Sequence, residues 1–222
     1  MLYENMAWTC LFRFLGILEP LCRNMASLTL FFVQQITVYM NMKKIKLYIT
    51  STIDGYNATP DGDLDWLIEY PNPEHSDYGF RDFLSNVDVI LMNEQTYHNL
   101  LCIDIIWPYK IWLYKGKATC IVSENSDKKT DSSINYIMGN NIDEIVRMKE
   151  SLNIGLIGSN ELTTMLLQHD LVDEMRISKI PILLGEGIPV FSPSYSMSSW
   201  DVEKNELYGN GVIQTIYHKN MV

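Results

Sequence analysis

The chain has 222 residues, of which 47% are hydrophobic and 20% are charged, a balance that allows one large core and excludes a disordered or collagen-like chain. Its 27 acidic residues outnumber its 17 lysines and arginines, and the formal charge of -10 repels the phosphate backbone of nucleic acids. We therefore expect no nucleic-acid partner. The four cysteines lie far apart without a C-x-x-C pair, so we expect reduced thiols in a cytoplasmic protein rather than a zinc site or disulfide framework.

The first 41 residues differ from the rest of the chain because they are mostly apolar. Their charged residues are Glu4, Arg13, Glu19 and Arg23, which cancel. The uncharged run at 24–42 is long enough for a membrane helix but contains several polar side chains, and the order of a signal peptide is missing. We interpret 1–41 as an appendage or a misassigned start before Met42. An interfacial helix and a membrane anchor remain alternatives, although we do not expect a membrane partner.

From residue 43 onward, strand-like runs alternate with helical patterns, which predicts an α/β domain at 42–222 with a sheet covered on both faces. We expect strands at 43–50, 87–92, 118–123 and 153–158. We expect helices at 77–85, from Glu94 onward, at 141–152 and at 160–169. A turn at Asp54-Gly55 leads into a long surface loop at 56–76, and 127–133 is a second loop. The strands expected at 200–208 and 212–218 flank Gly209-Asn210-Gly211, which indicates an antiparallel hairpin at the edge of a mainly parallel sheet.

The order of strand, glycine and helix at 153–169 indicates a possible anion site. Gly158 ends the expected strand, and Asn160 begins the next helix. The first N–H groups of a helix lack partners within the helix, and they lie at the positive end of its dipole. This arrangement suits a diphosphate, but it is common and needs support from other motifs.

Five stretches carry a family resemblance: 51–58 (STIDGYNA), 62–66 (GDLDW), 92–97 (MNEQTY), 156–162 (LIGSNEL) and 171–191 (LVDEMRISKIPILLGEGIPVF). In this order they resemble the dihydrofolate reductase-like superfamily, in particular small proteins related to the reductase domain of the bacterial riboflavin-biosynthesis deaminase-reductase. The resemblance covers nearly all of 43–218. It implies a three-layer α/β fold with a mainly parallel central sheet and a C-terminal antiparallel hairpin. Since related reductase domains pair, it also implies a homodimer.

The resemblance further implies hydride transfer from NADPH or NADH to a small pteridine- or pyrimidine-type substrate. Position by position, it assigns nicotinamide contacts to Thr50, Asn57 and Ala58, with Trp66 lining the same cleft. Contacts to phosphates or adenosine fall on Thr96 and Ser123. The diphosphate would lie against Gly158, Ser159 and Asn160, followed by Glu161 and Leu162 in the first helical turn.

Three departures weaken this cofactor signature. Asn93-Glu94 stands where relatives have Gly-Arg, whose arginine meets the cofactor's 2′-phosphate. Glu124 stands at a second basic position, and Ser159 replaces the second glycine of a pair. Because a carboxylate can bond an unphosphorylated ribose 2′-hydroxyl, Glu94 or Glu124 favours NADH. The alternative is a degenerate, non-catalytic ligand-binding homologue that has lost tight NADPH binding.

Two aspartates are candidates for direct roles. Asp77 precedes Asn93 by sixteen positions, as the catalytic acid of the family precedes its glycine; the alternative is that Asp77 caps the following helix. Asp54 is expected to bond its own turn, with a substrate contact as the alternative.

The remaining candidates are histidines and aromatic residues. The four histidines lack metal-ligand spacing, so we expect no metal. The aromatic residues Trp107, Tyr109, Trp112 and Tyr114 either stack on a ligand or pack in a core or interface.

Overall fold

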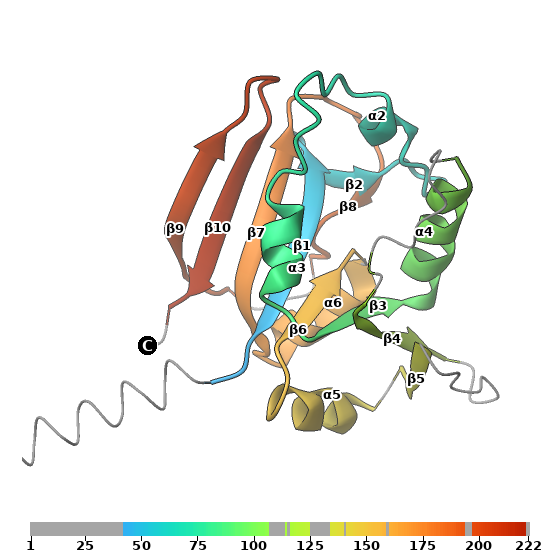
Figure 1. The fold of residues 1–222 in the computed structure, drawn as a ribbon, viewed down its shortest axis with the longest axis vertical. Coiled ribbons are helices and arrows are strands. Elements are labelled where there is room, and N and C mark those ends of the chain that lie inside the picture. Colours follow the sequence, from blue (N-terminus) through green and yellow to red (C-terminus); the bar gives the residue numbers. More distant parts are fainter. Residues whose placement is uncertain are drawn as a thin grey trace, which may run out of the picture. The chain divides into compact units, whose positions relative to one another are not determined.

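The computed structural model describes residues 42–106, 114, 116–124, 134–139, 141–158, 160–193 and 197–220, so the segment 1–41 lies outside it. In this part of the chain an eight-stranded sheet has the strand order β5-β4-β3-β6-β1-β7-β10-β9 (Figure 1). Its strands are β1 (Ile45–Thr52), β3 (Val89–Asn93), β4 (Ala118–Ser123), β5 (Ile134–Met138), β6 (Ile154–Ile157), β7 (Val172–Ile180), β9 (Trp200–Leu207) and β10 (Ile213–Lys219).

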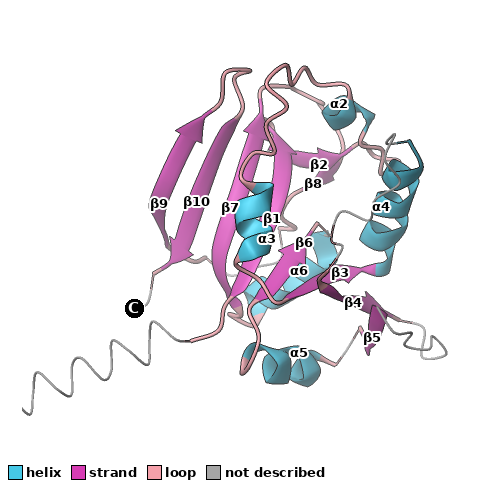
Figure 2. Cartoon of the chain, in the orientation of Figure 1, coloured by secondary structure: helices cyan, strands magenta, loops and turns pink. Residues whose placement is uncertain are grey.

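The helices and two short strands complete the described fold (Figure 2). The helices are α2 (Asp65–Ile68), α3 (Phe80–Ser85), α4 (Glu94–Ile106), α5 (Ile142–Lys149) and α6 (Asn160–Gln168). Strands β2 (Tyr56–Ala58) and β8 (Ile188–Pro189) pair antiparallel with each other, outside the main sheet.

The main sheet is parallel except at β10, which runs antiparallel to both β7 and β9. The prediction of a mainly parallel sheet with a C-terminal antiparallel hairpin is therefore confirmed. The first four residues of β3 are all buried, as expected for a central parallel strand covered on both faces.

Helices cover both faces of the sheet and make three layers. Alternate residues of β1 point to opposite faces, so Ile45, Leu47 and Ile49 pack in one apolar cluster with residues of α5 and α6. Tyr48 of the same strand packs on the other face, against the cluster that contains Phe83 of α3. Figure 1 shows α3 in front of the sheet and α6 behind it. The predicted three-layer α/β fold is confirmed.

Most predicted elements agree with the structure to within three residues at each end, but the segment 56–76 does not. We expected a loop there, and the structure contains β2 and α2. The partner of β2 is β8, more than a hundred residues further along the chain, so local sequence could not show this pairing. Strand β5 was not predicted. The loop expected at 127–133 and the aromatic residues Trp107, Tyr109 and Trp112 lie outside the described residues.

A buried ionic network joins α3 to the sheet. Glu174 and Arg176 on β7 are only 3% and 7% exposed. Arg176 Nε donates to Glu174 Oε1 at 2.8 Å, and its Nη1 donates to Asp82 Oδ2 of α3 at 2.6 Å. Lys46 Nζ of β1 lies 3.2 Å from Glu174 Oε2, and the guanidinium lies 5.9 Å from the centre of the Phe83 ring. Each charge in this network has an opposite partner, as burial requires.

The network also lowers the pKa of its two carboxyl groups. Burial alone would raise the pKa of Glu174, but Arg176 and Lys46 outweigh it and hold that pKa below its usual value. The hydrogen bond from Arg176 is the main reason why the pKa of Asp82 is lowered. Because both folded-state pKa values lie below the unfolded ones, these carboxylates stabilise the fold fully near neutral pH, and the stabilisation is lost as the pH falls through the folded values.

We expect Arg176→Met to lower the free energy of unfolding by about 3–5 kcal/mol, because it leaves Glu174 buried without its main partner. Lys204→Met removes an exposed ion pair with Glu206 at 2.5 Å and should change this free energy by less than about 1 kcal/mol. Urea denaturation of the full chain at neutral pH measures both values, and a repeat below about pH 4 should show a smaller difference. Equal losses in the two variants at neutral pH would contradict a stabilising network.

Candidate functional site

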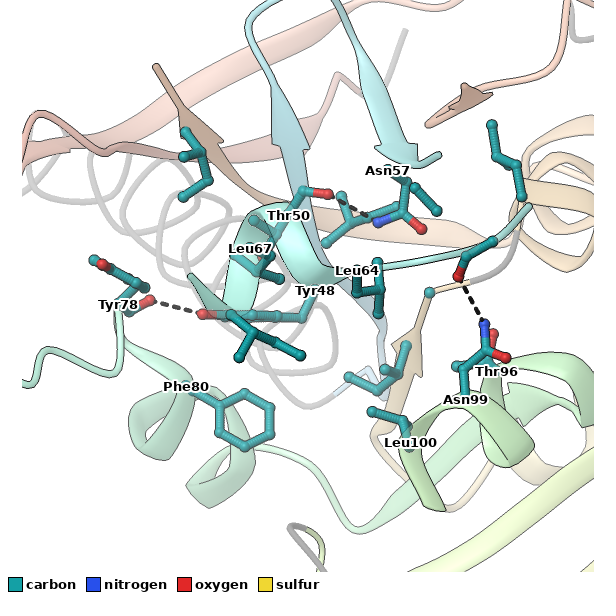
Figure 3. Close-up of a pocket in the computed structure, with 18 of the residues that line it drawn as sticks. Tyr48, Thr50, Asn57, Leu64, Leu67, Tyr78, Phe80, Thr96, Asn99 and Leu100 are labelled. Atoms are coloured by element: carbon teal, nitrogen blue, oxygen red, sulfur yellow. Dashed lines mark hydrogen bonds between the residues drawn. The ribbon is translucent and has the colours of Figure 1, made fainter. Parts of the chain in front are cut away.

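A cleft of about 1470 Å³ lies on the α3 face of the sheet (Figure 3). Its lining includes residues at or near the carboxyl ends of β1, β3, β6 and β7. These residues are Thr50, Asn93, Ile157 and Ile180. Because the four strands are parallel, these ends meet at one edge of the sheet, which is where open α/β sheets generally bind ligands.

Gly158 forms the turn between β6 and α6 and lines the cleft. Its φ of +59° lies in the left-handed region, and a Cβ at this position would lie 3.0 Å from Thr96 Cγ2. Asn93 Oδ1 accepts a hydrogen bond from the Thr96 N–H at 2.8 Å, which fixes the start of α4 beside this turn. The structure thus brings together Asn93, Thr96 and Gly158, three of the predicted cofactor contacts, and a glycine is required where β6 meets α6.

The start of α6 adds one more lining residue. Glu161, in the first turn of this helix, lines the cleft. Leu162 does not, because it is buried in the apolar cluster on the opposite face of the sheet. Ser159 and the side chain of Asn160 lie outside the described residues.

The predicted nicotinamide contacts also come together in the cleft. Thr50, Asn57 and Ala58 all belong to its lining. Asn57 Nδ2 donates to the Thr50 carbonyl oxygen at 2.9 Å (Figure 3). The Tyr56 N–H donates to Thr52 Oγ1 at 3.0 Å. These bonds tie β2 to the carboxyl end of β1.

Glu94 and Ser123 lie together at the ends of β3 and β4 but do not line the cleft as the described residues define it. Ser123 Oγ donates to Glu94 Oε2 at 2.7 Å, and His98 Nε2 lies 3.5 Å from Glu94 Oε1. The Glu94 side chain is 29% exposed. The two residues that the family resemblance assigns to the adenosine end of the cofactor are therefore joined by a hydrogen bond.

Trp66 was expected to line the cleft, but the structure does not place it in the lining. Helix α2 and the residue before it present Leu64, Leu67 and Ile68 to the cleft, the spacing of one helical face, and Trp66 lies off that face. Its Nε1 is buried and has no hydrogen-bond partner in the described part of the chain. The expectation failed because α2 itself was not predicted.

Asp54 also lies off the lining and contacts the chain rather than the cleft. Its Oδ2 accepts the Gly185 N–H at 2.8 Å. A hydrogen bond from Thr52 is the main reason why the pKa of this exposed carboxyl group is lowered. Asp54 thus fastens the β1–β2 turn to the segment before β8.

Asp77 lies at the rim of the cleft with the contacts of a capping residue. Its Oδ1 accepts the Gly79 N–H at 3.1 Å, and its Oδ2 accepts the Arg81 N–H at 3.3 Å. Arg81 Nε lies 3.5 Å from the same carboxylate, whose side chain is 39% exposed. Helix α3 begins at Phe80 rather than at Asp77, because Gly79 adopts a left-handed φ of +74°. These contacts agree with the alternative that Asp77 caps the start of α3. The catalytic role of Asp77 stays a prediction.

The sequence analysis missed Tyr48, which lies on the floor of the cleft. Its hydroxyl donates to the Tyr78 carbonyl oxygen at 3.0 Å (Figure 3), and burial raises its pKa well above the usual value, so the group keeps its proton. Gln214 Nε2 of β10 donates to Ser178 Oγ at 2.9 Å. The alternation of β1, which places Tyr48 and Thr50 on one face, was the available signal.

The tip of the β9–β10 hairpin holds the segment 70–79, which forms one wall of the cleft. Asn210 Nδ2 donates to Tyr78 Oη at 2.6 Å and to the Pro71 carbonyl oxygen at 2.9 Å. Tyr70 Oη donates to the Asn210 carbonyl oxygen at 2.6 Å. Tyr208 packs its ring against that of Tyr78 in an edge-to-face contact at 5.0 Å. Residues far apart in the sequence therefore shape the same wall.

Comparison with known proteins places this fold in a family. No family model matches the chain. It is 30% identical over 173 residues to the uncharacterized protein YwjB of Bacillus subtilis, covering 77% of this chain and 95% of YwjB. A Shewanella sp. PV-4 structure named "Putative riboflavin biosynthesis protein" is 31% identical, with a TM-score of 0.69 over 80% of this chain and 99% of that one. A dihydrofolate reductase from Enterococcus faecalis, complexed with NADP(H), has a TM-score of 0.55 at 14% identity over 81% and 98% of the two chains.

The chain belongs to the dihydrofolate reductase-like superfamily. The resemblance drawn from the five sequence stretches is thereby confirmed. Across the described residues, no helix is both long and apolar enough to cross a membrane. The same residues contain no group of three or more His, Cys, Asp and Glu side chains placed to hold a metal ion.

We expect Gly158→Ala to lower the free energy of unfolding by about 1 kcal/mol for its left-handed backbone and by about 1–3 kcal/mol more for the contact with Thr96. Gly185→Ala is the matched control, because Gly185 also has a left-handed φ but nothing lies within 4 Å of its added Cβ. Denaturant titration of both variants measures the difference. Adding Thr96→Ala to Gly158→Ala should recover the second loss, and equal losses at both glycines would contradict a tight turn.

We expect Asn210→Ala to speed amide hydrogen exchange in residues 70–79, because it removes the donor to Tyr78 and Pro71 and costs about 1–2 kcal/mol. Asn205→Ala, which removes an exposed bond to Thr215 on the same hairpin, is the control. Hydrogen exchange read by mass spectrometry resolves the segment. Unchanged exchange at 70–79 in Asn210→Ala would show that the hairpin tip does not hold this wall.

Proposed function

We propose that the protein is an NAD(P)H-dependent reductase of a small pteridine- or pyrimidine-type substrate. The cleft carries the proposal, because its lining joins Thr50 and Asn57 at the end of β1 to Gly158 at the start of α6. The family resemblance assigns these positions to the nicotinamide and the diphosphate. The superfamily relationship supports a reductase-like fold, and NADP(H) is the ligand named for the Enterococcus faecalis structure.

Different residues of the cleft could contact the diphosphate and the nicotinamide of such a dinucleotide. The start of α6 follows Gly158 directly and is the positive end of the helix dipole, so it would stabilise a diphosphate beside Gly158. Thr50, with its carbonyl oxygen held by Asn57, would orient the nicotinamide ring. The apolar residues of α2 that line the cleft would exclude water from the reacting ring. The bound cofactor supplies the hydride.

Glu94 supports NADH rather than NADPH as the preferred cofactor. Its carboxylate is held by Ser123 at 2.7 Å, in the place where relatives carry an arginine for the 2′-phosphate. A carboxylate about 4 Å from a phosphate costs about 1 kcal/mol in water and about 4 kcal/mol near a protein surface. The same carboxylate can accept a hydrogen bond from a ribose 2′-hydroxyl.

The second candidate function is a non-catalytic ligand-binding homologue, and Asp77 is the observation that favours it. A carboxyl group that delivers a proton near neutral pH needs burial to raise its pKa. The Asp77 side chain is 39% exposed, pairs with Arg81 and accepts two backbone N–H groups. A turnover assay with NADH and a dihydropterin or aminopyrimidine acceptor distinguishes the two functions, since the homologue binds without oxidising NADH.

We expect the full chain to bind NADH more tightly than NADPH in a calorimetric titration. Glu94→Arg should strengthen NADPH binding by about tenfold or more, because it replaces a repulsion of at least about 1 kcal/mol with an attraction. Glu94→Gln, which removes the charge without adding one, should give a smaller gain. Tighter NADPH binding by the unmodified protein would overturn the NADH preference. No binding of either cofactor would overturn the proposed reductase.

A further inference from the structure

The tip of the β9–β10 hairpin carries the only Asn-Gly pair of the sequence, Asn210-Gly211. In such a pair the backbone nitrogen of the glycine can attack the side-chain amide of the asparagine, because glycine has no side chain to hinder the approach. The fold requires a glycine here, since Gly211 has a left-handed φ of +88° and a Cβ on it would lie 3.4 Å from Pro181 Cγ. It also uses the Asn210 amide to hold the segment 70–79. Both members of a chemically labile pair are therefore built into the hairpin tip.

The turn at the tip favours this attack. The Gly211 N–H donates to the Tyr208 carbonyl oxygen at 2.9 Å, which closes a tight turn. The Val212 N–H donates to Asn210 Oδ1 at 3.4 Å, so the Asn210 side chain curls around the Gly211 peptide. The same N–H would stabilise negative charge on Oδ1 as the amide carbon is attacked. Gly211 is exposed, so a base in the solvent can reach its nitrogen.

The segment 70–79 opposes the same reaction by holding the amide nitrogen. Asn210 Nδ2 donates to the Pro71 carbonyl oxygen at 2.9 Å and to Tyr78 Oη at 2.6 Å. Nδ2 is the atom that must leave, and it can leave only after both hydrogen bonds break. The pair is therefore protected while the segment 70–79 lies against the hairpin tip.

The segment that the tip holds is strained. His75 and Tyr78 have φ values of +49° and +47°, a left-handed conformation that side chains disfavour. Such backbone persists only where its surroundings hold it. The bonds from Asn210 belong to those surroundings, together with the bond from the Tyr48 hydroxyl to the Tyr78 carbonyl oxygen at 3.0 Å. Both strained residues line the cleft, so a change at the tip reaches the wall of the cleft.

We propose that Asn210 is a deamidation site that the segment 70–79 protects, and that its deamidation releases this segment from the hairpin tip. A base in the solvent takes the proton from the Gly211 nitrogen, which forms a bond to Asn210 Cγ. The bond from Cγ to Nδ2 breaks, and ammonia leaves with a proton from water. Water then opens the succinimide ring and leaves an aspartate or isoaspartate at position 210. The net reaction consumes water and releases ammonia without oxidation or reduction, and it is independent of the proposed reductase.

The new carboxylate would fit the wall poorly. It has no N–H to donate, so the bond to the Pro71 carbonyl oxygen is lost, although the Tyr78 hydroxyl can turn its own proton toward the carboxylate. Glu74 adds repulsion, because its carboxylate lies so close to Gly209 that a Cβ there would collide with it. The lost bond and the two neighbouring carboxylates both favour release of the segment 70–79.

Ageing of the full chain in mildly alkaline buffer, followed by peptide mass spectrometry, tests the site. We expect Asn210 to be converted before Asn205, an exposed asparagine of the same hairpin whose next residue, Glu206, carries a side chain that hinders attack. Ion exchange separates the product, because each conversion adds one negative charge. Conversion of Asn210 no faster than that of Asn205 overturns the site.

Two phenylalanine variants test the protection. Tyr78→Phe removes one acceptor of Asn210 Nδ2 and keeps the ring that packs against Tyr208. We expect it to speed the conversion of Asn210 by about two- to tenfold, the value of one hydrogen bond. Tyr208→Phe is the matched control, since it removes the hydroxyl of the other ring, which is no partner of the Asn210 amide in the described chain. Equal rates in the two variants overturn protection by the segment 70–79.

Hydrogen exchange in the segment 70–79 tests the release. Asn210→Asp imitates one product, and Asn205→Asp places the same charge elsewhere on the hairpin. We expect exchange in this segment to be about tenfold faster in Asn210→Asp and unchanged in Asn205→Asp. If Asn210→Asp does not fold, the aged chain separated by ion exchange takes its place, with the fresh chain as its control. Exchange that is equal in variant and control overturns the release.

Discussion

The alternation of side chains along β1 places the apolar core on one face of the sheet and the cleft on the other. Ile45, Leu47 and Ile49 fill the core against α5 and α6, so the residues between them must face α3. Lys46 then reaches the buried Glu174, Tyr48 lies on the floor of the cleft, and Thr50 lies at its carboxyl end. A slip of one residue in this strand would bury a lysine among aliphatic side chains and would empty the floor of the cleft.

Two non-local contacts hold the walls of the cleft around that floor. The bond from Arg176 to Asp82 fixes α3, and it belongs to a network whose charges are costly to separate. The bonds from Asn210 fix the segment 70–79, although that segment has no regular structure of its own between α2 and α3. Removing the first contact disturbs a buried ionic network, whereas removing the second releases only a surface segment. We therefore expect the wall at 70–79 to have the lower local stability. We therefore expect the segment 70–79 beside the β9–β10 hairpin to open more readily than the wall formed by α3.

The sequence predicted those parts of the fold that local patterns determine. The strand expected at 118–123 is β4 without any change, and Gly158 lies between a strand and a helix as expected. The contacts that complete the site join residues more than a hundred positions apart, such as Tyr78 and Asn210, and no local pattern reports such partners. Trp66 shows how one missed element changes a predicted site. Because 56–76 was predicted to be a loop, α2 was missed, and the sequence could not show that Leu67 rather than Trp66 faces the cleft.

Two carboxylates in and near the cleft already have partners in the protein. At the end of β3, Glu94 stands where relatives carry a phosphate-binding arginine, and beside α3 the guanidinium of Arg81 is paired with Asp77. In the proposed reductase, Glu94 would oppose a 2′-phosphate on the bound dinucleotide. The helix dipole of α6 still favours the diphosphate that every nicotinamide dinucleotide shares, because backbone N–H groups need no basic side chain to bind it. In the proposed function, the start of α6 would therefore hold the dinucleotide bridge without a basic side chain, while Glu94 would select against a 2′-phosphate.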